Sequence, residues 1–316
     1  MFIWFGDLDG LAQARHIRPA PAVFVLFATA LLVLISSWKW KVILGRLHLG
    51  RTCPILDCFR VVLLGVSLGQ IVPQDVGSAG ARITYLRGVR GFPFDQATYS
   101  VFLDRWLDVV VLVVVLPFSA LFAAGLISVQ WGLTLVFMIV LALVITGALW
   151  PAAVTIAFAR GFTLVASLLR RFLRTEENRP WVASARHEPL SGAQMPVLLA
   201  MAFARILIVG ARAWFTILAV GIDMSFSDAL MLVPVAQVGL MVPLTPGGLG
   251  TYDAGWYALL TIQGVSAADA VLFVVMHRVL VMLSLIAMVG LVEAPLQLRN
   301  LVLRRWGTAA RRLERP

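Results

Sequence analysis

Charged residues are scarce in this sequence: Asp, Glu, Lys and Arg make up 13% of the 316 residues, while 60% are hydrophobic. A soluble domain carries about 25% charged residues, so the composition excludes a soluble enzyme or a soluble binding domain. The net charge is +10, but the basic residues fall between hydrophobic runs and do not alternate with aromatic residues. We therefore expect no nucleic-acid partner.

Residues that carry common catalytic or metal chemistry are also few. The sequence has two cysteines, Cys53 and Cys58, and four scattered histidines. Two thiols in a basic segment predict neither a structural disulfide nor a metal site. There is no metal-ligand pair, no His-x-x-x-x-Asp acyl-transfer pattern and no Gly-x-x-x-x-Gly-Lys phosphate loop. We expect neither an enzyme nor a cofactor.

Long apolar runs dominate the chain. A membrane span needs about 20 apolar residues, so the length allows roughly seven or eight membrane segments. The runs long enough to span are 21–38, 97–121, 132–158, 195–220 and 268–291. Shorter runs at 55–72, 229–242 and 255–262 adjoin segments with Pro and Gly. This pattern predicts an all-α polytopic membrane protein.

Arginine and lysine gather between the runs, at 39–60, 74–92, 160–188 and 299–315, whereas 119–131, 221–228 and 263–269 contain neither. Basic segments face the cytoplasm, which predicts a multi-pass protein of a bacterial inner membrane. The predicted organisation is an N-terminal interfacial segment (1–20), a first membrane repeat with a connecting span (21–159), a basic cytoplasmic loop (160–194), a second membrane repeat (195–295) and a basic cytoplasmic tail (296–316).

Two stretches of the chain resemble each other. Ile71-Val-Pro-Gln-Asp-Val-Gly-Ser-Ala-Gly80 aligns with Met241-Val-Pro-Leu-Thr-Pro-Gly-Gly-Leu-Gly250. After a shift of three residues the match continues, because Gly91, Ala97 and Arg105 have the spacing of Gly264, Ala270 and Arg278. The charge rule gives the two copies opposite orientations. Inverted-topology repeats are typical of transporters.

Each Pro/Gly block is interpreted as a re-entrant helical hairpin, with a kinked membrane span as the alternative. The flanking apolar runs are mostly too short to cross about 30 Å of hydrocarbon. Proline prevents a continuous helix, and glycine lets the chain reverse. Broken backbone at membrane depth lines a cavity or is buried in protein, where freed amides favour an anion. The predicted hairpin tips are Pro73, Gly77, Gly80, Pro243, Pro246, Gly247, Gly248 and Gly250.

Several polar side chains lie within or beside the apolar runs, where an unpaired charge costs a few kcal/mol and usually faces a cavity. The predicted substrate-binding residues are Arg82, Asp104, Arg105, Asp108, Asp253, His277 and Arg278. Arg105 and Asp108 have the i,i+3 spacing of a pair on one helix face. An internal ion-pair network that holds helices together is the alternative for these charges. Arg205 lies within the run 195–220, and its side chain could instead extend to the cytoplasmic interface. For Arg82 the alternative is an anchor to lipid at the inner surface. For His277 the alternative is a buried histidine of the core.

These motifs resemble the flippase-like family that includes the transmembrane translocation domain of bacterial lysyl-phosphatidylglycerol synthases, the multiple peptide resistance factors. Residues 10–295 carry the resemblance, most specifically Val242-Pro-Leu-Thr-Pro-Gly-Gly-Leu-Gly-Thr-Tyr-Asp253, which is similar to the family's Pro-x-x-Pro-Gly-Gly-Leu-Gly-x-x-Glu. Arg82, the Asp104-Arg105 pair and Arg278 match further family positions. Where the family often carries an acid after the first Gly pair, this chain has Ala79, with Asp75 nearby.

The resemblance implies that the protein moves an anionic or lipid-linked substrate between leaflets, with membrane lipids as partners. The soluble domain with which the synthases transfer lysine has no counterpart in these 316 residues, so no lysine transfer is expected. Two alternatives stay open: an accessory subunit that binds lipid- or envelope-biosynthesis proteins, and a membrane-embedded enzyme that modifies a lipid.

Overall fold

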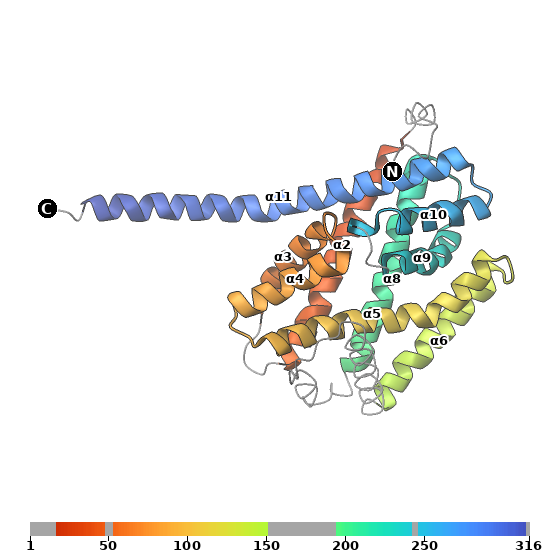
Figure 1. The fold of residues 1–316 in the computed structure, drawn as a ribbon, viewed down its shortest axis with the longest axis horizontal. Coiled ribbons are helices and arrows are strands. Elements are labelled where there is room, and N and C mark those ends of the chain that lie inside the picture. Colours follow the sequence, from red (N-terminus) through yellow and green to blue (C-terminus); the bar gives the residue numbers. More distant parts are fainter. Residues whose placement is uncertain (1–16, 48–52, 151–193, 242–245, 314–316) are drawn as a thin grey trace, which may run out of the picture.

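The computed structural model describes residues 17–47, 53–150, 194–241 and 246–313 of the chain. Within these ranges the structure is all-helical, with no strand (Figure 1). The predicted all-α fold is therefore confirmed. The elements, in chain order, are α2 (Pro19–Leu47), α3 (Ile55–Leu68), α4 (Gln74–Gly88), α5 (Phe94–Ala123), α6 (Val129–Leu149), α8 (Gln194–Val220), α9 (Phe226–Met241), the short 3₁₀ helix η5 (Pro246–Gly248), α10 (Thr251–Ile262) and α11 (Ala267–Leu313).

Five of the described helices are long and apolar enough to cross a membrane: Pro19–Gly45, Gln96–Ala123, Val129–Leu149, Gln194–Val220 and Ala267–Pro295. They correspond to the five long apolar runs of the sequence, so the chain is a multi-pass membrane protein. One expectation was wrong, because the first span does not end at Lys39: α2 continues to Leu47. In the run 132–158, helix α6 ends at Leu149. Beyond Trp150, residues 151–193 lie outside the described part, and with them nearly all of the predicted basic loop.

The helices are arranged around a central pair, α2 and α8, which pack side by side (Figure 1). The short helices α3 and α4 pack on each other and α3 contacts α2, while α9 and α10 pack on each other and α9 contacts α8. Helix α5 contacts α4, α9 and α6. Helix α11 contacts α2, α3, α8 and α10. The two short-helix pairs thus lie on either side of the central helices.

Helix α6 is the least buried of the spans, with only Gly132, Val136, Val140 and Gly147 buried among its residues. A Cβ atom at Gly132 would lie 2.6 Å from Cε of Met231, so glycine allows the close approach of α6 to α9. The other faces of α6 expose large apolar side chains, as lipid-facing helices do.

The four helices of the two short-helix pairs are shorter than a typical membrane span. The longest of them, α9, has 16 residues, or roughly 24 Å at 1.5 Å per residue, against a hydrocarbon core of about 30 Å. Helix α4 begins directly after Pro73. A Cβ atom on Gly77 would lie 2.8 Å from the Gly69 nitrogen, so this glycine lets α4 fold back closely on the end of α3. Gly80 lies inside α4 with open space around it.

The second Pro/Gly block is a glycine turn. Gly247, Gly248 and Gly250 have φ values of 58°, 70° and 95°, in the left-handed region that favours glycine. Pro246 begins η5, whereas Pro243 falls in 242–245, outside the described residues. The backbone amide of Gly247 donates a hydrogen bond to the carbonyl oxygen of Val72 at 3.3 Å. The two Pro/Gly blocks, which lie about 170 residues apart in the sequence, therefore touch in the folded structure.

Candidate functional site

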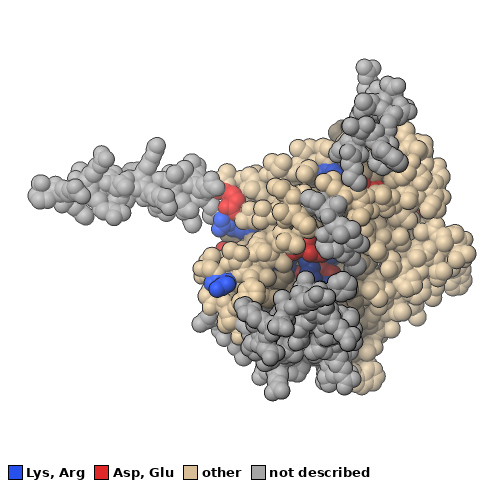
Figure 2. Space-filling model, in the orientation of Figure 1, with Lys and Arg blue, Asp and Glu red and all other residues tan. Residues whose placement is uncertain are grey.

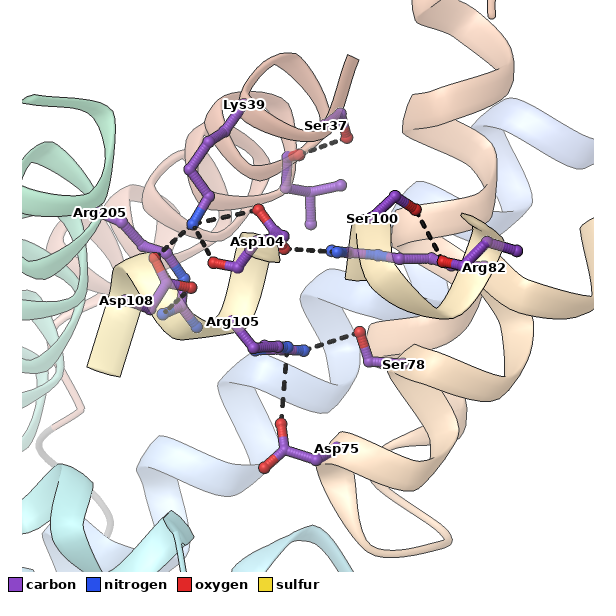
Figure 3. A network of polar contacts seen from close by, with 12 residues as sticks. Ser37, Lys39, Asp75, Ser78, Arg82, Ser100, Asp104, Arg105, Asp108 and Arg205 are labelled. Carbon is purple, nitrogen blue, oxygen red and sulfur yellow. Dashed lines mark hydrogen bonds and ion pairs between the residues drawn. The ribbon is translucent and has the colours of Figure 1, made fainter. Parts of the chain in front are cut away.

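A buried ion-pair network joins α2, α4 and α5 (Figure 3). Asp104 accepts a hydrogen bond from Nη1 of Arg82, and its Oδ1 lies 3.1 Å from Nζ of Lys39. Lys39 also donates to Oδ1 of Asp108 and, at 2.9 Å, to the backbone oxygen of Asp104. The guanidinium carbon of Arg82 lies 5.1 Å from the centre of the Trp40 ring, a favourable cation–π position. The four charged groups neutralise one another.

Arg105 and Asp108 extend this network toward α4 and α8. Nη2 of Arg105 donates to Oγ of Ser78 at 2.7 Å, and its Nε lies 3.6 Å from Oδ1 of Asp75. Oδ2 of Asp108 accepts from Nη1 of Arg205 at 3.1 Å. The expected pairing of Arg105 with Asp108 is therefore replaced, since each side chain meets a partner on another helix.

A second cluster surrounds Arg278 on α11. Its Nε donates to Oδ1 of Asp253 at 2.7 Å, and its Nη1 donates to the carbonyl oxygen of Gly247 at 3.2 Å. The other carboxylate oxygen of Asp253 accepts from the backbone amide of Gly250 at 3.1 Å. Asp253 thus caps the start of α10 while it orients Arg278, which ties the glycine turn to the last span.

His277 faces the α8 helix from the same part of α11. Thr216 donates its hydroxyl hydrogen to the carbonyl oxygen of Arg212 at 2.9 Å, so its oxygen accepts from Nδ1 of His277 at 3.2 Å. The imidazole ring stacks on Phe273, 5.6 Å between ring centres. His277 is 4% exposed, and these contacts match the core-histidine alternative.

Both clusters line one cavity. It contains about 900 Å³ of space free of protein atoms, counting the solvent at its mouth. Its charged lining comprises Arg82, Asp104, Arg105, Asp108, Arg205, Arg212 and Arg278, and its neutral polar lining includes Gln70, Gln74, Gln237, Tyr252 and His277. All seven charged residues except Arg82 lie inside candidate spans.

A second cavity adjoins the first, because Gln74, Arg105, Asp108 and Arg205 line both. Its other lining residues are Asp75 and Gln237 and the apolar residues Val109, Leu112, Ile206, Val209 and Leu240. Charged and apolar linings therefore meet between α5, α8 and α9. On the face shown in Figure 2, uncharged residues dominate, and acidic and basic side chains appear together in a recess near its centre.

The structure brings six of the seven predicted site residues to the cavity wall: Arg82, Asp104, Arg105, Asp108, His277 and Arg278. Asp253 is not in the lining but holds Arg278. Lys39 was missed, because its place at the end of an apolar run indicated an interfacial residue. The signal that could have found it is the continued apolar pattern of residues 42–44 after the lysine. Arg205 pairs with Asp108, in place of the interfacial position considered from sequence.

A further group of contacts lies at the other ends of α3 and α4. Arg60 donates from Nε and Nη2 to the two carboxylate oxygens of Glu293 at 2.8 and 2.7 Å, which fastens α3 to α11. Asp57 accepts from Tyr85 at 2.9 Å and from Arg90 at 2.6 Å. A hydrogen bond from Cys58, assisted by Tyr85 and Arg90, lowers the pKa of the nearby Cys53 thiol to about 6 against the opposing effect of burial.

The donor set of the cavity suits an anion. Guanidinium groups bind phosphate and carboxylate oxygens through paired N–H donors, and five arginines line this cavity. Over the described ranges no group of three or more His, Cys, Asp or Glu side chains is placed to hold a metal ion.

No curated protein and no solved structure matches the chain. The family described as the lysylphosphatidylglycerol synthase TM region matches residues 1–290, nearly the whole sequence and every residue of the charged clusters. The chain therefore belongs to the family of the lysylphosphatidylglycerol synthase transmembrane region.

Proposed function

We propose that the protein is a flippase-like lipid translocator of a bacterial inner membrane, which moves an anionic or lipid-linked substrate between the leaflets. The observation that carries the proposal is a cavity lined by five arginines and only two carboxylates, with nearly all of these charges inside apolar spans. Charges at this depth are energetically costly, and the residues that carry them usually line a substrate or ion path. The protein supplies binding and shelter, and no covalent step.

The headgroup binds in the charged cavity. Arg105, Arg205, Arg212 and Arg278 come from three different spans and line the same space. Charged lipid headgroups cross a bilayer slowly because desolvation of the charge in hydrocarbon is unfavourable. Guanidinium donors replace the water around the headgroup, so the barrier to its crossing falls.

The acyl chains follow the adjoining cavity. Its apolar walls, Val109, Leu112, Ile206 and Val209, stand directly beside Arg105 and Arg205. A water-soluble anion would need no such apolar lining, whereas a lipid needs both kinds of surface in contact. This juxtaposition favours a lipid over a soluble ion as the substrate.

The two short-helix pairs are proposed to be re-entrant hairpins of an inverted-topology repeat. Three features support this assignment: the matched Pro/Gly blocks in the sequence, helices too short to span, and the hydrogen bond from Gly247 to Val72 that joins the two blocks. The glycines matched downstream, Gly91 and Gly264, both have positive φ values, of 66° and 84°. Tilting of one repeat against the other would expose the cavity to each leaflet in turn.

A scrambling measurement tests the function. Purified protein is reconstituted into vesicles that contain a trace of tail-labelled fluorescent anionic lipid, and a membrane-impermeant quencher is added outside. We expect protein-dependent quenching beyond the outer leaflet's half, and a loss of about tenfold or more in the rate on Arg105→Gln, given the strength of charge-assisted hydrogen bonds. Arg87→Gln is the matched control, because Arg87 lies exposed at the end of α4 and does not line the cavity.

The alternatives predict different results. An accessory subunit would show no protein-dependent quenching, would keep wild-type behaviour in cells when Arg105 and Arg278 are replaced by alanine, and would co-purify with a biosynthetic protein. A lipid-modifying enzyme would convert the labelled lipid to a product that is separable by chromatography, and the conversion would be lost on His277→Ala. Either outcome contradicts the proposed translocation.

A further inference from the structure

The cations in and around the cavity differ in whether a carboxylate compensates them. Lys39, Arg82 and Arg205 each meet a carboxylate of Asp104 or Asp108. Arg212 of α8 does not. None of the ion pairs between described residues includes Arg212.

Arg212 shares a face of α8 with Arg205 and Val209, at positions i+7, i and i+4, and all three line the cavity. Its Nε is shielded from solvent and has no hydrogen-bond acceptor among the described residues. Tyr252 is its neutral polar neighbour. A shielded guanidinium without a carboxylate is unfavourable unless another anion accompanies it.

Arg278 adds a second free donor to the same wall. Two of its nitrogens are used, since Nε binds Asp253 and Nη1 binds the Gly247 carbonyl. Its Nη2 is shielded and has no acceptor in the described part of the chain. The hydroxyl of Tyr252, which lies beside Arg212, is likewise shielded and has no hydrogen-bond partner in the described part of the chain. Three unsatisfied polar groups therefore line one cavity.

The charge balance of the cavity and its ion-pair partners points to the same conclusion. Six cationic side chains, Lys39, Arg82, Arg105, Arg205, Arg212 and Arg278, stand against four carboxylates, Asp75, Asp104, Asp108 and Asp253. The described residues thus leave an excess of two positive charges. A ligand with two negative charges would neutralise it.

We propose that Arg212 and Arg278, with the Tyr252 hydroxyl, form a phosphate subsite, and that the translocated lipid carries a dianionic headgroup, as a phosphomonoester or a pair of phosphates does. This inference rests on the proposed function for its lipid part. Planar guanidinium groups present paired donors that match phosphate oxygens, and Tyr252 supplies an uncharged donor. A headgroup with one negative charge leaves one cation of the cavity unpaired.

Transport of three lipids with identical labelled tails tests the headgroup assignment. The lipids are a phosphatidic acid, a phosphatidylglycerol and a phosphatidylethanolamine, with net charges of about −2, −1 and 0 at pH 8. We expect the phosphatidic acid to move about tenfold faster than the phosphatidylglycerol, by analogy with the strength of one charge-assisted contact. Phosphomonoesters take up a proton near pH 6, so the preference should disappear at pH 5.

The variant Arg212→Gln isolates the subsite. It should lower the phosphatidic acid rate by about tenfold and the phosphatidylglycerol rate by much less, so that the two rates become similar. It should also leave the thermal midpoint of the ligand-free protein unchanged or raise it, because removal of an uncompensated cation relieves repulsion. Equal slowing of all three lipids, or equal wild-type rates for phosphatidic acid and phosphatidylglycerol, would overturn the inference while leaving translocation intact.

A binding measurement separates the subsite from translocation. Detergent-solubilised protein is titrated with short-chain phosphatidic acid and with inorganic phosphate, each followed by the shift in thermal midpoint, in the wild type, Arg212→Gln and Arg87→Gln. The subsite is supported if the lipid raises the thermal midpoint of the wild type and of Arg87→Gln but not that of Arg212→Gln. This conclusion holds even if no lipid is transported. Failure of transport alone would reject only the proposed function. A rise with inorganic phosphate and none with the lipid would identify a soluble anion as the ligand and overturn the lipid assignment.

Discussion

Gly247 donates its backbone amide hydrogen to the carbonyl oxygen of Val72 at 3.3 Å. This bond joins the tip of the α3–α4 pair to the glycine turn before α10. Arg278 reaches the same turn, where its Nη1 donates to the Gly247 carbonyl oxygen while its Nε donates to Asp253. Gly247 therefore takes part both in the contact between the two halves of the chain and in holding Arg278 at the wall of the cavity.

Replacement of Gly247 by alanine should destabilise this junction. Its φ of +58° is unfavourable for other residues, and a Cβ atom would lie 3.2 Å from the Gln70 carbonyl oxygen. We expect a loss of about 1–2 kcal/mol in the free energy of unfolding from the left-handed backbone alone. Gly80→Ala is the matched control, since α4 leaves open space around Gly80 and helix propensity favours alanine by about 1 kcal/mol. Equal thermal midpoints of the two variants would contradict the expected role of Gly247.

Lys39→Met should be among the most destabilising single substitutions in the chain. It leaves Asp104 and Asp108 with one fewer cation in a nearly dry environment, and removal of one partner of a buried pair costs about 3–5 kcal/mol. The free energy of unfolding in detergent measures the effect. Lys41→Met, two residues further along α2 and partly exposed, should have little effect. A loss no larger than that of Lys41→Met would contradict the role assigned to Lys39.

Accessibility to a membrane-impermeant thiol reagent tests the inverted arrangement. In a background of Cys53→Ala and Cys58→Ala, new cysteines replace Arg87 near the end of α4 and Gln263 just after α10, both exposed positions. If the halves are inverted, Arg87→Cys should react only from the cytoplasmic side and Gln263→Cys only from the outside. Reaction of both from the same side would rule out the inverted repeat.

Cys53 should react as a thiolate at neutral pH. Its pKa is lowered to about 6, with the hydrogen bond from Cys58 as the largest cause. The deprotonated form therefore dominates above pH 6 and is lost as the pH falls below it. The rate of reaction with a small thiosulfonate should rise through a midpoint near pH 6, and Cys58→Ala should move this midpoint upward. A wild-type midpoint near 8.5, the value of a free cysteine, would contradict the prediction.

Most of the fold was predictable from the lengths of the apolar runs and from the positions of Lys and Arg. The five long apolar runs became the five candidate spans, because roughly 20 apolar residues have few stable states other than a membrane helix. The end of α2 was misplaced at Lys39, since a lysine after an apolar run usually marks an interface. Only the three-dimensional partner, the Asp104–Asp108 pair of α5, makes a lysine stable inside the span.

The candidate site was predictable where polar residues interrupt apolar runs. Asp104, Arg105, His277 and Arg278 were identified in this way, and all of them line the cavity. Their partners were not predictable, because a pairing between helices such as Arg105 with Ser78 depends on packing that sequence spacing does not encode. Arg212 was visible as a charge in a span, but its lack of a carboxylate partner is a property of the folded arrangement.

Helix α11 continues without interruption from Ala267 to Leu313, although its candidate span ends at Pro295. The 18 residues after Pro295 form an arm of roughly 27 Å at 1.5 Å per residue. Proline removes one backbone hydrogen bond where the arm leaves the span, and Glu293, two residues earlier, is gripped by Arg60 of α3. A tilt of α3 would therefore pull on Glu293 at the base of this arm, and a rotation of about 10° there would move its far end by roughly 5 Å.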